Sequence, residues 1–308
     1  MTLRKRLFVT GAQGFVGQYI QAAVQRDEHA VFEVVCAEDQ YDITDRESLD
    51  RVIKRAQPDA VIHLAAQSHV PTSFSDPELT YRVNFFGTLA LLQSLAANDF
   101  VGRMLFVGSA DSYGLVEEQD LPISEKQALH PRNPYAVSKV AAEALCYQWS
   151  QTGPFDVVIA RPFNHIGPGQ AESFAISGFA KQIAEIVAGL RVPELNVGDL
   201  QVTRDFTDVR DIVEAYLLLV LKGESGDAYN VGSGQERRLY ELLEELIQIA
   251  GVSATIKIDS ARFRPAEQRR VVCDASKLKI RTGWHPRHSI NDTLVEIIQY
   301  WVRKIQNG

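Results

Sequence analysis

Residues 10–17 read Thr10-Gly11-Ala12-Gln13-Gly14-Phe15-Val16-Gly17 and come directly after an apolar run, Leu7–Val9. Glycines three residues apart, after a strand and before a helix, are typical of a dinucleotide-binding turn. Gly11 allows the tight turn, Gly14 lets a pyrophosphate approach the backbone, and Gly17 lets the helix pack closely on the strand. The stretch therefore predicts a dinucleotide held by backbone N–H groups at the N-terminus of the helix.

The pattern around this turn is that of a parallel sheet wound with crossover helices. Short β-rich runs alternate with segments whose apolar residues recur at intervals of three and four, as in amphipathic helices. The apolar runs are Leu7–Val9, Val31–Cys36, Ala60–Leu64, Met104–Val107 and Val157–Ala160. We expect an α/β protein with a Rossmann doubly wound parallel sheet and a smaller C-terminal α/β lobe for the substrate.

The spacing of prolines and glycines changes after Gly167-Pro168-Gly169, and from there on these residues separate shorter elements. We therefore expect the cofactor domain to span residues 1–165, with a returning segment near 200–222. The substrate lobe is expected to span residues 166–199 and 223–308. No internal repeat or long linker is visible, which favours one interlocked pair over two independent domains.

The composition argues against several classes of protein. The chain has 308 residues, 45% of them hydrophobic, and a net charge of −7. Because it has no overall basic field, we expect no nucleic-acid partner and no binding to a membrane. Three cysteines, Cys36, Cys146 and Cys273, are few, odd in number and without metal-like spacing, which suits the cytoplasm and predicts no metal site.

Acidic residues after the second predicted strand are candidates for the adenosine end of the cofactor. Glu38 and Asp39 lie roughly 20 residues beyond the last glycine, where a carboxylate would bind the ribose. The alternative interpretation is that they are two solvated loop acids. No Arg or Lys occurs in residues 36–43, which favours NADH over NADPH.

The residues that follow are further candidates for cofactor contacts. Asp42 and Ile43 come next, and one of the polar groups here is an alternative partner for the adenine. Thr44 could cap the next helix, with Glu47 closing a capping box.

A second group of residues is typical of proton transfer. Tyr135 and Lys139 stand four residues apart and therefore share one face of a predicted helix. A phenol with a pKa of about 10 is a poor proton shuttle near neutrality, and a neighbouring ammonium favours its phenolate. We therefore expect Lys139 to lower the pKa of Tyr135. By itself this spacing is common in helices.

Ser109 comes after the apolar run Met104–Val107, at the carboxyl end of a predicted strand, where open α/β sheets bind ligands. Its hydroxyl can donate a hydrogen bond to a substrate carbonyl and polarise it toward hydride. The alternative is a serine that only caps the end of the strand.

Together these motifs resemble the extended short-chain dehydrogenases over nearly the whole chain. The resemblance rests on the glycine motif, His63-Leu64-Ala65-Ala66, Asn84-x-x-Gly87-Thr88, the Ser109 strand end and Tyr135-x-x-x-Lys139. It implies that Ser109, Tyr135 and Lys139 are catalytic and that Tyr135 and Lys139 also contact the cofactor, NADH or NADPH. It further implies that the cofactor is lined by Leu64, Ala65, Ala66 and Phe163, and that Asn84 supports the active-site helix.

The C-terminal half resembles the nucleotide-sugar branch of this family. The matching segments are residues 161–170, 179–183, 203–209, 229–231, 262–267 and 282–286. They look most like the reductases of GDP-linked 4-keto-6-deoxy sugars. This implies reduction of the C4 ketone of GDP-4-dehydro-6-deoxy-D-mannose to GDP-D-rhamnose.

The same resemblance implies a set of substrate contacts. The diphosphate would be bound by Arg204 and Arg264, and the ribose hydroxyls by Glu267. Arginine forks match phosphate oxygens, while a carboxylate accepts hydrogen bonds from paired hydroxyls. The other contacts would be Ser109 and Ala110 at the reacting carbon, and Asn164 and Lys181 at the hexose–phosphate region.

Several alternatives stay open. A 4,6-dehydratase needs an added acid/base pair beside the serine or threonine. In the dehydratases that stretch reads Thr-Asp-Glu or Thr-Ser-Glu, whereas here it reads Ser109-Ala110-Asp111. Ala110 transfers no proton and Asp111 is one methylene shorter than glutamate, which favours a net reductase. A 4-epimerase and a catalytically silent NAD(P)-binding regulator are the others, and the joint presence of Ser109, Tyr135 and Lys139 disfavours the regulator.

A homodimer is expected from the same resemblance, with helices near residues 85–95 and 135–149 paired across a two-fold axis. The apolar faces of these helices could equally pack inward.

Overall fold

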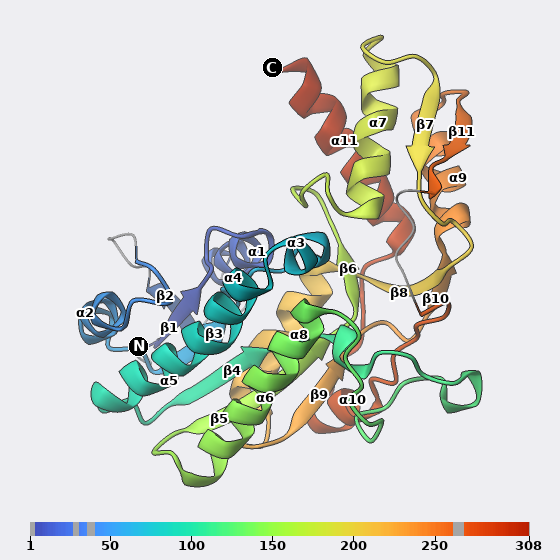
Figure 1. Cartoon of the computed structure of the whole chain (residues 1–308). Helices are drawn as coiled ribbons and strands as arrows, with labels where there is room; N and C mark the ends of the chain where they lie inside the picture. Colours follow the sequence, from blue (N-terminus) through green and yellow to red (C-terminus); the bar gives the residue numbers. More distant parts are fainter. Residues whose placement is uncertain (1–3, 27–30, 36–40, 261–267, 308) are drawn as a thin grey trace.

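The computed structural model describes residues 4–26, 31–35, 41–260 and 268–307. A six-stranded parallel sheet forms its centre (Figure 1). The strand order is β2-β1-β3-β4-β5-β9, with bounds Phe32–Val35, Lys5–Thr10, Ala60–His63, Arg103–Val107, Asp156–Pro162 and Ala228–Val231. Each predicted apolar run overlaps one of these strands. The order reverses between β1 and β3, so the carboxyl ends of these two strands flank the crevice where such sheets bind ligands.

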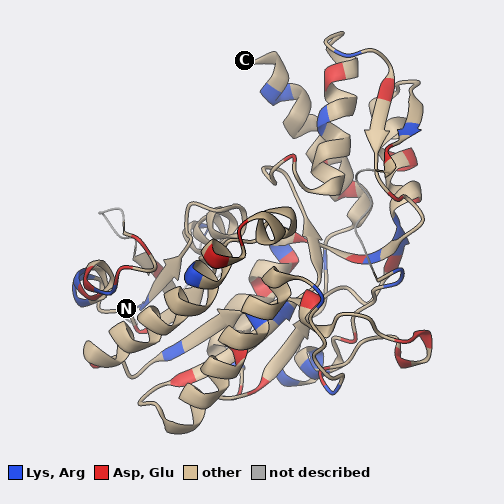
Figure 2. Cartoon of the chain, in the orientation of Figure 1, with Lys and Arg blue, Asp and Glu red and all other residues tan. Residues whose placement is uncertain are grey.

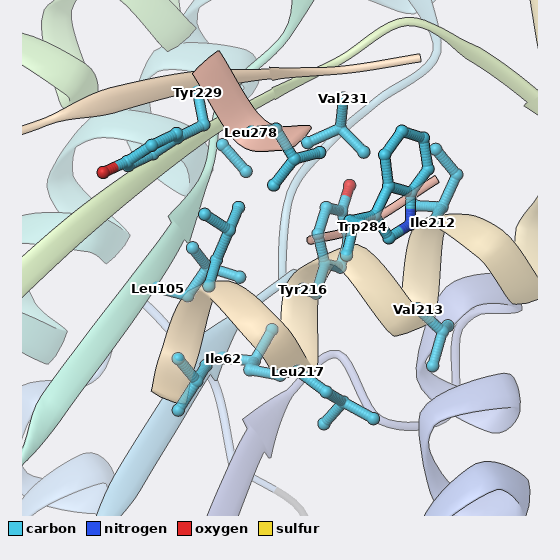
Figure 3. Packing of buried hydrophobic residues seen from close by; sticks show 14 of the residues in the cluster. Ile62, Leu105, Ile212, Val213, Tyr216, Leu217, Tyr229, Val231, Leu278 and Trp284 are labelled. Atoms are coloured by element: carbon cyan, nitrogen blue, oxygen red, sulfur yellow. The ribbon is translucent and has the colours of Figure 1, made fainter. Parts of the chain in front are cut away.

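Helices cover both faces of this sheet because successive side chains of a strand point to opposite sides. On one face, Leu7, Ile62 and Leu105 pack with helices α1 (Phe15–Gln25) and α8 (Val209–Lys222). Figure 3 shows Leu217 of α8 beside Ile62 in this core.

On the other face, Phe8, Val61 and Met104 pack with three further helices. These are α2 (Arg46–Ala56), α5 (Gly87–Ala97) and α6 (Pro134–Thr152). Short helical turns precede α5, namely α3 (Val70–Ser75), α4 (Pro77–Tyr81) and the π-helical turn η1 (Arg82–Phe86). The three layers confirm the predicted doubly wound α/β fold.

A smaller lobe is built from the remaining strands and helices (Figure 1). One sheet has the order β10-β8-β6, formed by Glu236–Arg238, Thr203–Asp208 and Asn164–Ile166. A second sheet pairs β11 (Thr255–Ile258) with β7 (Glu194–Val197). The lobe has its own core, in which Phe179, Leu243 and Trp301 come from α7 (Ala175–Val187), α9 (Leu239–Ala250) and α11 (Ile290–Gln306).

The chain crosses between the two parts more than once, and the domain boundaries stay a prediction. β8 lies in the predicted returning segment, yet it belongs to the lobe's sheet, whereas α8 directly after it packs on the central sheet. β9, which the predicted division gives to the lobe, pairs with β5 at the edge of the central sheet. After β9 the chain adds α10 (Ser276–Thr282), which contacts α8 and β9.

One predicted helix start is wrong. Helix α2 begins at Arg46, and its N-cap is Asp45, whose carboxylate accepts a hydrogen bond from the Glu47 N–H at 3.1 Å. Thr44 is not the cap because Asp42 engages it: the Thr44 N–H and hydroxyl both donate to Asp42 Oδ1 at 2.8 Å.

Charges of both signs are interspersed, as Figure 2 shows for helix α2, where basic and acidic residues alternate. Within the part of the chain that the structure describes, no helix has the length and apolarity that crossing a membrane requires. The same residues include no cluster of three side chains able to hold a metal ion.

Candidate active site

The glycine-rich turn joins β1 to α1 where the strand order reverses. Gly11 has a φ of +72°, which favours glycine, and a Cβ there would lie 2.9 Å from the backbone nitrogen of Ala65. At Gly17 a Cβ would lie 2.6 Å from the carbonyl oxygen of Ala12. Glycine at these two positions therefore lets the turn touch the residues after β3 and lets α1 pack on the turn.

The start of α1 fits a phosphate group. Its N-cap, Gly14, has no side chain to occupy the N–H groups of the first turn. A Cβ at Gly14 would meet only the carbonyl oxygen of Gly11, at 3.1 Å, so a ligand can approach the backbone there. Gln13 precedes the cap, and Phe15 and Val16 begin the helix. The positive end of the helix dipole adds a favourable field for the pyrophosphate of a dinucleotide.

The residues after β2 and β3 lie around this turn. Leu64, Ala65 and Ala66 follow β3 and are half-buried. Ile43 is buried, and a Cβ at Gly87 would touch its side chain at 3.1 Å, so the start of α5 packs on this residue. Glu38 and Asp39 lie outside the described residues.

Asp42 is exposed, and its two hydrogen bonds from Thr44 hold its pKa below the usual value, an effect to which the Arg82 guanidinium adds. The sequence-based preference for NADH rested on the absence of Arg and Lys from residues 36–43. The fold also brings Arg82 close enough to Asp42 for its charge to affect the pKa of that carboxyl.

The hydroxyls of Ser109 and Tyr135 meet at the carboxyl end of β4. Ser109 is 9% exposed and its Oγ accepts a hydrogen bond from the Asp111 N–H at 3.1 Å. The Ser109 side chain lies close enough to Tyr135 to lower the pKa of the phenol. Tyr135 stands in the first turn of α6, where the N-cap Asn133 accepts a hydrogen bond from the backbone N–H of Ala136 at 2.7 Å. The cap therefore fixes the turn that presents the phenol to Ser109.

Lys139 lies one turn further along α6 and is 4% exposed. Its Nζ donates a hydrogen bond to the Val107 carbonyl at 2.8 Å and lies 5.2 Å from the centre of the Phe106 ring. Burial lowers the pKa of Lys139 to about 8. The structure thus brings the three predicted catalytic residues together at one strand end.

The pKa of Tyr135 shifts in the direction opposite to the one expected. Burial raises the pKa of the phenol, and the charge of Asp111 raises it further, while the Ser109 side chain lowers it. Lys139 is not among the groups that shift the pKa of Tyr135, and desolvation is the largest effect on the pKa of each residue. Tyr135 therefore keeps its proton at neutral pH, which is the state that a proton donor requires.

A buried amide supports the first turn of α6 from behind. Asn84, in η1, is 2% exposed, and its Nδ2 donates to Ser138 Oγ at 2.9 Å and to the Gln67 carbonyl at 3.0 Å. Its Oδ1 accepts a hydrogen bond from the Gln67 N–H at 2.8 Å. Ser138 in turn donates to the Tyr135 carbonyl at 2.6 Å. Sequence reasoning missed Ser138, because its partner lies 54 residues away and leaves no local signal.

A second buried network joins α6 to β5 and β9. Arg161 forms an ion pair with Glu143, and both side chains are 8% exposed. The Arg161 Nη1 donates to the Tyr113 hydroxyl at 2.9 Å, which donates to Asn230 Oδ1 at 2.6 Å. Sequence reasoning missed Glu143 and Tyr113 as well. Because these groups pair with one another, the network holds the elements beneath the active site together.

Some predicted contacts lie close to Ser109 and the start of the lobe. Ala110 is half-buried in the short helical turn η2 (Ala110–Tyr113), next to Ser109. Phe163 is 3% exposed, and its ring centroid lies 6.4 Å from that of Tyr113. Asn164 begins β6 and is exposed.

Two further predicted contacts, Lys181 and Arg204, lie in the lobe. Lys181, on α7, is engaged by carboxylates, with its Nζ 2.7 Å from Glu172 and 3.7 Å from Glu185. Arg204, on β8, donates from Nη1 to the carbonyl of Thr203 at 2.7 Å. Arg264 and Glu267 lie outside the described residues.

The strands β8 and β10 border an open cavity of about 480 Å³. It is lined by Glu118, Gln201, Thr203, Glu236, Arg238, Glu241, Arg269 and Arg270. Guanidinium groups suit the oxygens of a phosphate. Arg270 is already held by Glu236 through hydrogen bonds of 2.9 and 2.8 Å, so it is less available to an anion than the 68% exposed Arg269 side chain.

Comparison with known proteins identifies relatives over the full length. Residues 39–297 match the family model described as GDP-mannose 4,6 dehydratase. The chain is similar to GDP-6-deoxy-D-mannose reductase of Pseudomonas aeruginosa, with 48% identity over 304 residues and 99% of each chain covered. It is similar to GDP-mannose 4,6 dehydratase 2 of Arabidopsis thaliana, with 34% identity, covering 85% of this chain and 70% of that one.

A solved structure gives the same result in three dimensions. The structure of RMD from Pseudomonas aeruginosa complexed with NADPH matches with a TM-score of 0.93 and 48% identity, covering 97% of this chain and 99% of that one.

Proposed function

Because the chain belongs to the GDP-mannose 4,6-dehydratase family of extended short-chain dehydrogenases, we propose that it is an NAD(P)H-dependent reductase of a GDP-linked ketosugar. The reaction is reduction of the C4 ketone of GDP-4-dehydro-6-deoxy-D-mannose to GDP-D-rhamnose. The observation that carries this proposal is the full-length similarity to the Pseudomonas aeruginosa GDP-6-deoxy-D-mannose reductase. The geometry around Ser109 and Tyr135 supports the same chemistry.

Ser109 and Tyr135 orient the ketone and supply the proton. When bound, a reduced nicotinamide supplies the hydride. The two hydroxyls lie close enough for Ser109 to lower the pKa of Tyr135, so a ketone oxygen placed between them can accept from both. Ser109 polarises the carbonyl, and Tyr135, whose pKa is raised by burial, gives its proton to the developing alkoxide.

Lys139 supplies a buried cation one helical turn from Tyr135. With a pKa of about 8, most Lys139 ammonium groups are charged at neutral pH. The hydrogen bond to the Val107 carbonyl holds the ammonium on the same helical face as Tyr135. We also assign Lys139 a contact with the nicotinamide ribose, as in the family that this chain resembles.

The cofactor is bound between the ends of β1 and β3. The glycine turn and the start of α1 hold the pyrophosphate, and Leu64, Ala65, Ala66 and Phe163 line the rest. NADPH is supported by the cofactor in the similar Pseudomonas aeruginosa structure and by the place of Arg82 near Asp42. NADH is the alternative, supported by the acidic residues Glu38 and Asp39 in the sequence.

Polar and charged residues of the second half of the chain bind the diphosphate and the sugar. Arg204 and Arg264 bind the diphosphate and Glu267 the ribose, while Asn164 and Lys181 contact the hexose–phosphate region. Lys181 reaches a phosphate by exchanging its carboxylate partner Glu172 for it. The cavity beside β8 offers guanidinium groups to an anionic nucleotide, although glutamates in equal number line it as well.

Dehydration of GDP-mannose is the second candidate, because the family model and the Arabidopsis relative carry that name. It needs a group that moves a proton at C5 of the hexose, in addition to the Ser109–Tyr135 pair. Ala110 offers no such group. Asp111 lies near enough to raise the pKa of Tyr135, so it is the one nearby carboxylate to test for this role.

The active form is a homodimer in the cytoplasm. Phe86, Val137 and Tyr147, on η1 and α6, are 56%, 39% and 53% exposed, and exposed apolar side chains on neighbouring elements suit a protein interface. The small number of cysteines supports a reducing compartment. Neither a nucleic acid nor a membrane is a partner.

A panel of 4-keto nucleotide sugars tests the proposal. The purified chain is mixed with NADPH or NADH and with GDP-, TDP- or UDP-linked 4-keto-6-deoxy sugars, and kcat/KM is measured from cofactor absorbance. The GDP-linked sugar should give the highest value. Preference for a TDP- or UDP-linked sugar would reject the guanosine assignment, and no cofactor oxidation with any ketosugar would reject the reductase itself.

A further inference from the structure

His63, the last residue of β3, lies between the cofactor turn and the catalytic helix. It is 2% exposed. Its Nδ1 is 2.7 Å from Thr10 Oγ1, at the end of β1, and its Nε2 is 3.0 Å from Thr88 Oγ1, in α5. Both threonines are fully buried, so each of these hydroxyls depends on protein partners.

The neighbouring hydrogen bonds determine which ring nitrogen carries the proton. Thr88 donates its only hydroxyl proton to the Asn84 carbonyl at 2.6 Å, so it can only accept from His63 Nε2–H. A neutral ring then has a bare Nδ1, which accepts from the Thr10 hydroxyl. Thr10 Oγ1 itself accepts from the Ala65 N–H at 3.2 Å. The direction of each hydrogen bond is therefore fixed: Thr10 donates to His63, His63 donates to Thr88, and Thr88 donates to the Asn84 carbonyl.

The chain of hydrogen bonds continues to the catalytic residues. From Thr88 it reaches the backbone of Asn84, and the Asn84 side chain donates to Ser138, which donates to the Tyr135 carbonyl. It thus begins at the strand that leads into the glycine turn and ends in the first turn of α6. At Asn84 the link is the residue itself, whose backbone carbonyl accepts from Thr88 and whose side-chain amide donates to Ser138.

We propose that His63 is a positioning residue, whose neutral imidazole sets the position of Tyr135 and Lys139 relative to the cofactor turn. The proposal rests on the proposed reductase function for its kinetic test. His63 touches no reacting atom; it acts through Thr88 and Asn84 on the helix that presents the phenol. Hydride transfer depends on distances of a few tenths of an ångström, so loosening this link should lower kcat more than it weakens binding.

The surroundings keep the imidazole neutral. Burial, followed by the charge of Lys139, lowers the pKa of His63 to about 3. Among the residues that the structure describes, Lys139 is the charged group that affects the pKa of this ring. A protonated ring would turn Nδ1 into a donor and break the bond from Thr10, so the neutral state preserves the direction of the whole chain.

Substitutions at Thr88 test the link without touching the active site. Thr88→Val removes the hydroxyl and keeps the shape, whereas Thr88→Ser keeps the hydroxyl. A matched control is Thr293→Val, since Thr293 is also fully buried and donates to Asp208 at 2.6 Å, in the lobe. We expect Thr88→Val to lower kcat on the order of tenfold, with KM and cofactor Kd changed less than about threefold. Thr88→Ser should keep more than about half of wild-type kcat, and Thr293→Val should leave it unchanged.

A second measurement does not depend on turnover. Amide hydrogen exchange of the ligand-free protein should be faster in the first turn of α6 for Thr88→Val than for wild type or Thr293→Val. If Thr88→Val does not fold, His63→Gln replaces it, because the Gln amide can still donate to Thr88 but loses the Thr10 link. Equal kcat in Thr88→Val and Thr293→Val, or unchanged exchange in α6, would overturn the proposal. An inactive wild type would instead reject the reductase function, and the exchange data would still decide the role of His63.

Discussion

Acidification from pH 7 to pH 5 should destabilise the wild-type protein by about 2 kcal/mol more than a His63→Gln variant. His63 has a pKa of about 3 in the folded protein, against 6.5 for an ordinary imidazole. Between these values the unfolded chain binds a proton that the folded protein does not. The unfolded state therefore gains relative stability as the pH falls below 6.5, and the loss continues until about pH 3.

The magnitude follows from the unfolded state, in which the imidazole is almost fully protonated at pH 5. Protonation there lowers its free energy by about 2 kcal/mol relative to pH 7. This figure is insensitive to the folded pKa as long as that value lies well below 5. Only 2% of His63 is exposed, so solvent screening does not reduce the effect.

Urea unfolding at the two pH values measures the effect, provided that tryptophan fluorescence and circular dichroism give coincident transitions. The quantity compared is the change in unfolding free energy between pH 7 and pH 5, wild type minus His63→Gln. The other histidines are common to both proteins and cancel. A difference below about 0.5 kcal/mol would refute the assignment of His63 as a buried neutral ring.

Three further predictions concern the reaction. Tyr135→Phe should lower kcat by about 10²–10⁴-fold and leave cofactor affinity, measured by fluorescence titration, nearly intact, because it removes the proton donor and keeps the ring; near-normal turnover would exclude the acid role. Ser109→Ala should chiefly lower kcat, whereas Arg204→Ala should chiefly raise KM, because the diphosphate lies far from the reacting carbon; the reverse split in steady-state kinetics would mean that the substrate binds in another orientation. The protein alone should not dehydrate GDP-mannose efficiently, since Ala110 carries no proton-transfer group; robust formation of the 4-keto-6-deoxy sugar, detected by mass spectrometry, would establish a dehydratase.

Features that depend on neighbours in sequence were predictable. The glycine spacing of residues 11–17 predicts a strand, a turn and a helix because each glycine has a local steric reason, and the structure contains β1 and α1 there. The same holds for the four-residue spacing that brings Tyr135 and Lys139 to one face of α6.

Features that depend on contacts between residues far apart in the sequence could not be predicted. Ser138 contributes through Asn84, which the fold brings to it from 54 residues away. The pKa of Tyr135 follows burial, which the spacing of Tyr135 and Lys139 does not reveal. The capping pattern made Thr44 a candidate helix cap. It does not show that the Thr44 hydroxyl donates to Asp42 instead, because that contact depends on side-chain geometry. The guanosine preference comes from resemblance, since no local pattern distinguishes the bases.

Transfer of the hydride from the nicotinamide to C4 of the hexose can be tested directly with a deuterium label. The protein is incubated with GDP-4-dehydro-6-deoxy-D-mannose and NADPH or NADH that carries two deuterium atoms at C4 of the nicotinamide, and the product is analysed by mass spectrometry and NMR. We expect one cofactor to be oxidised per sugar, with GDP-D-rhamnose as the product and one deuterium at C4 of its hexose. Conversion of the sugar without cofactor oxidation, or a product with no deuterium at C4, would contradict this expectation.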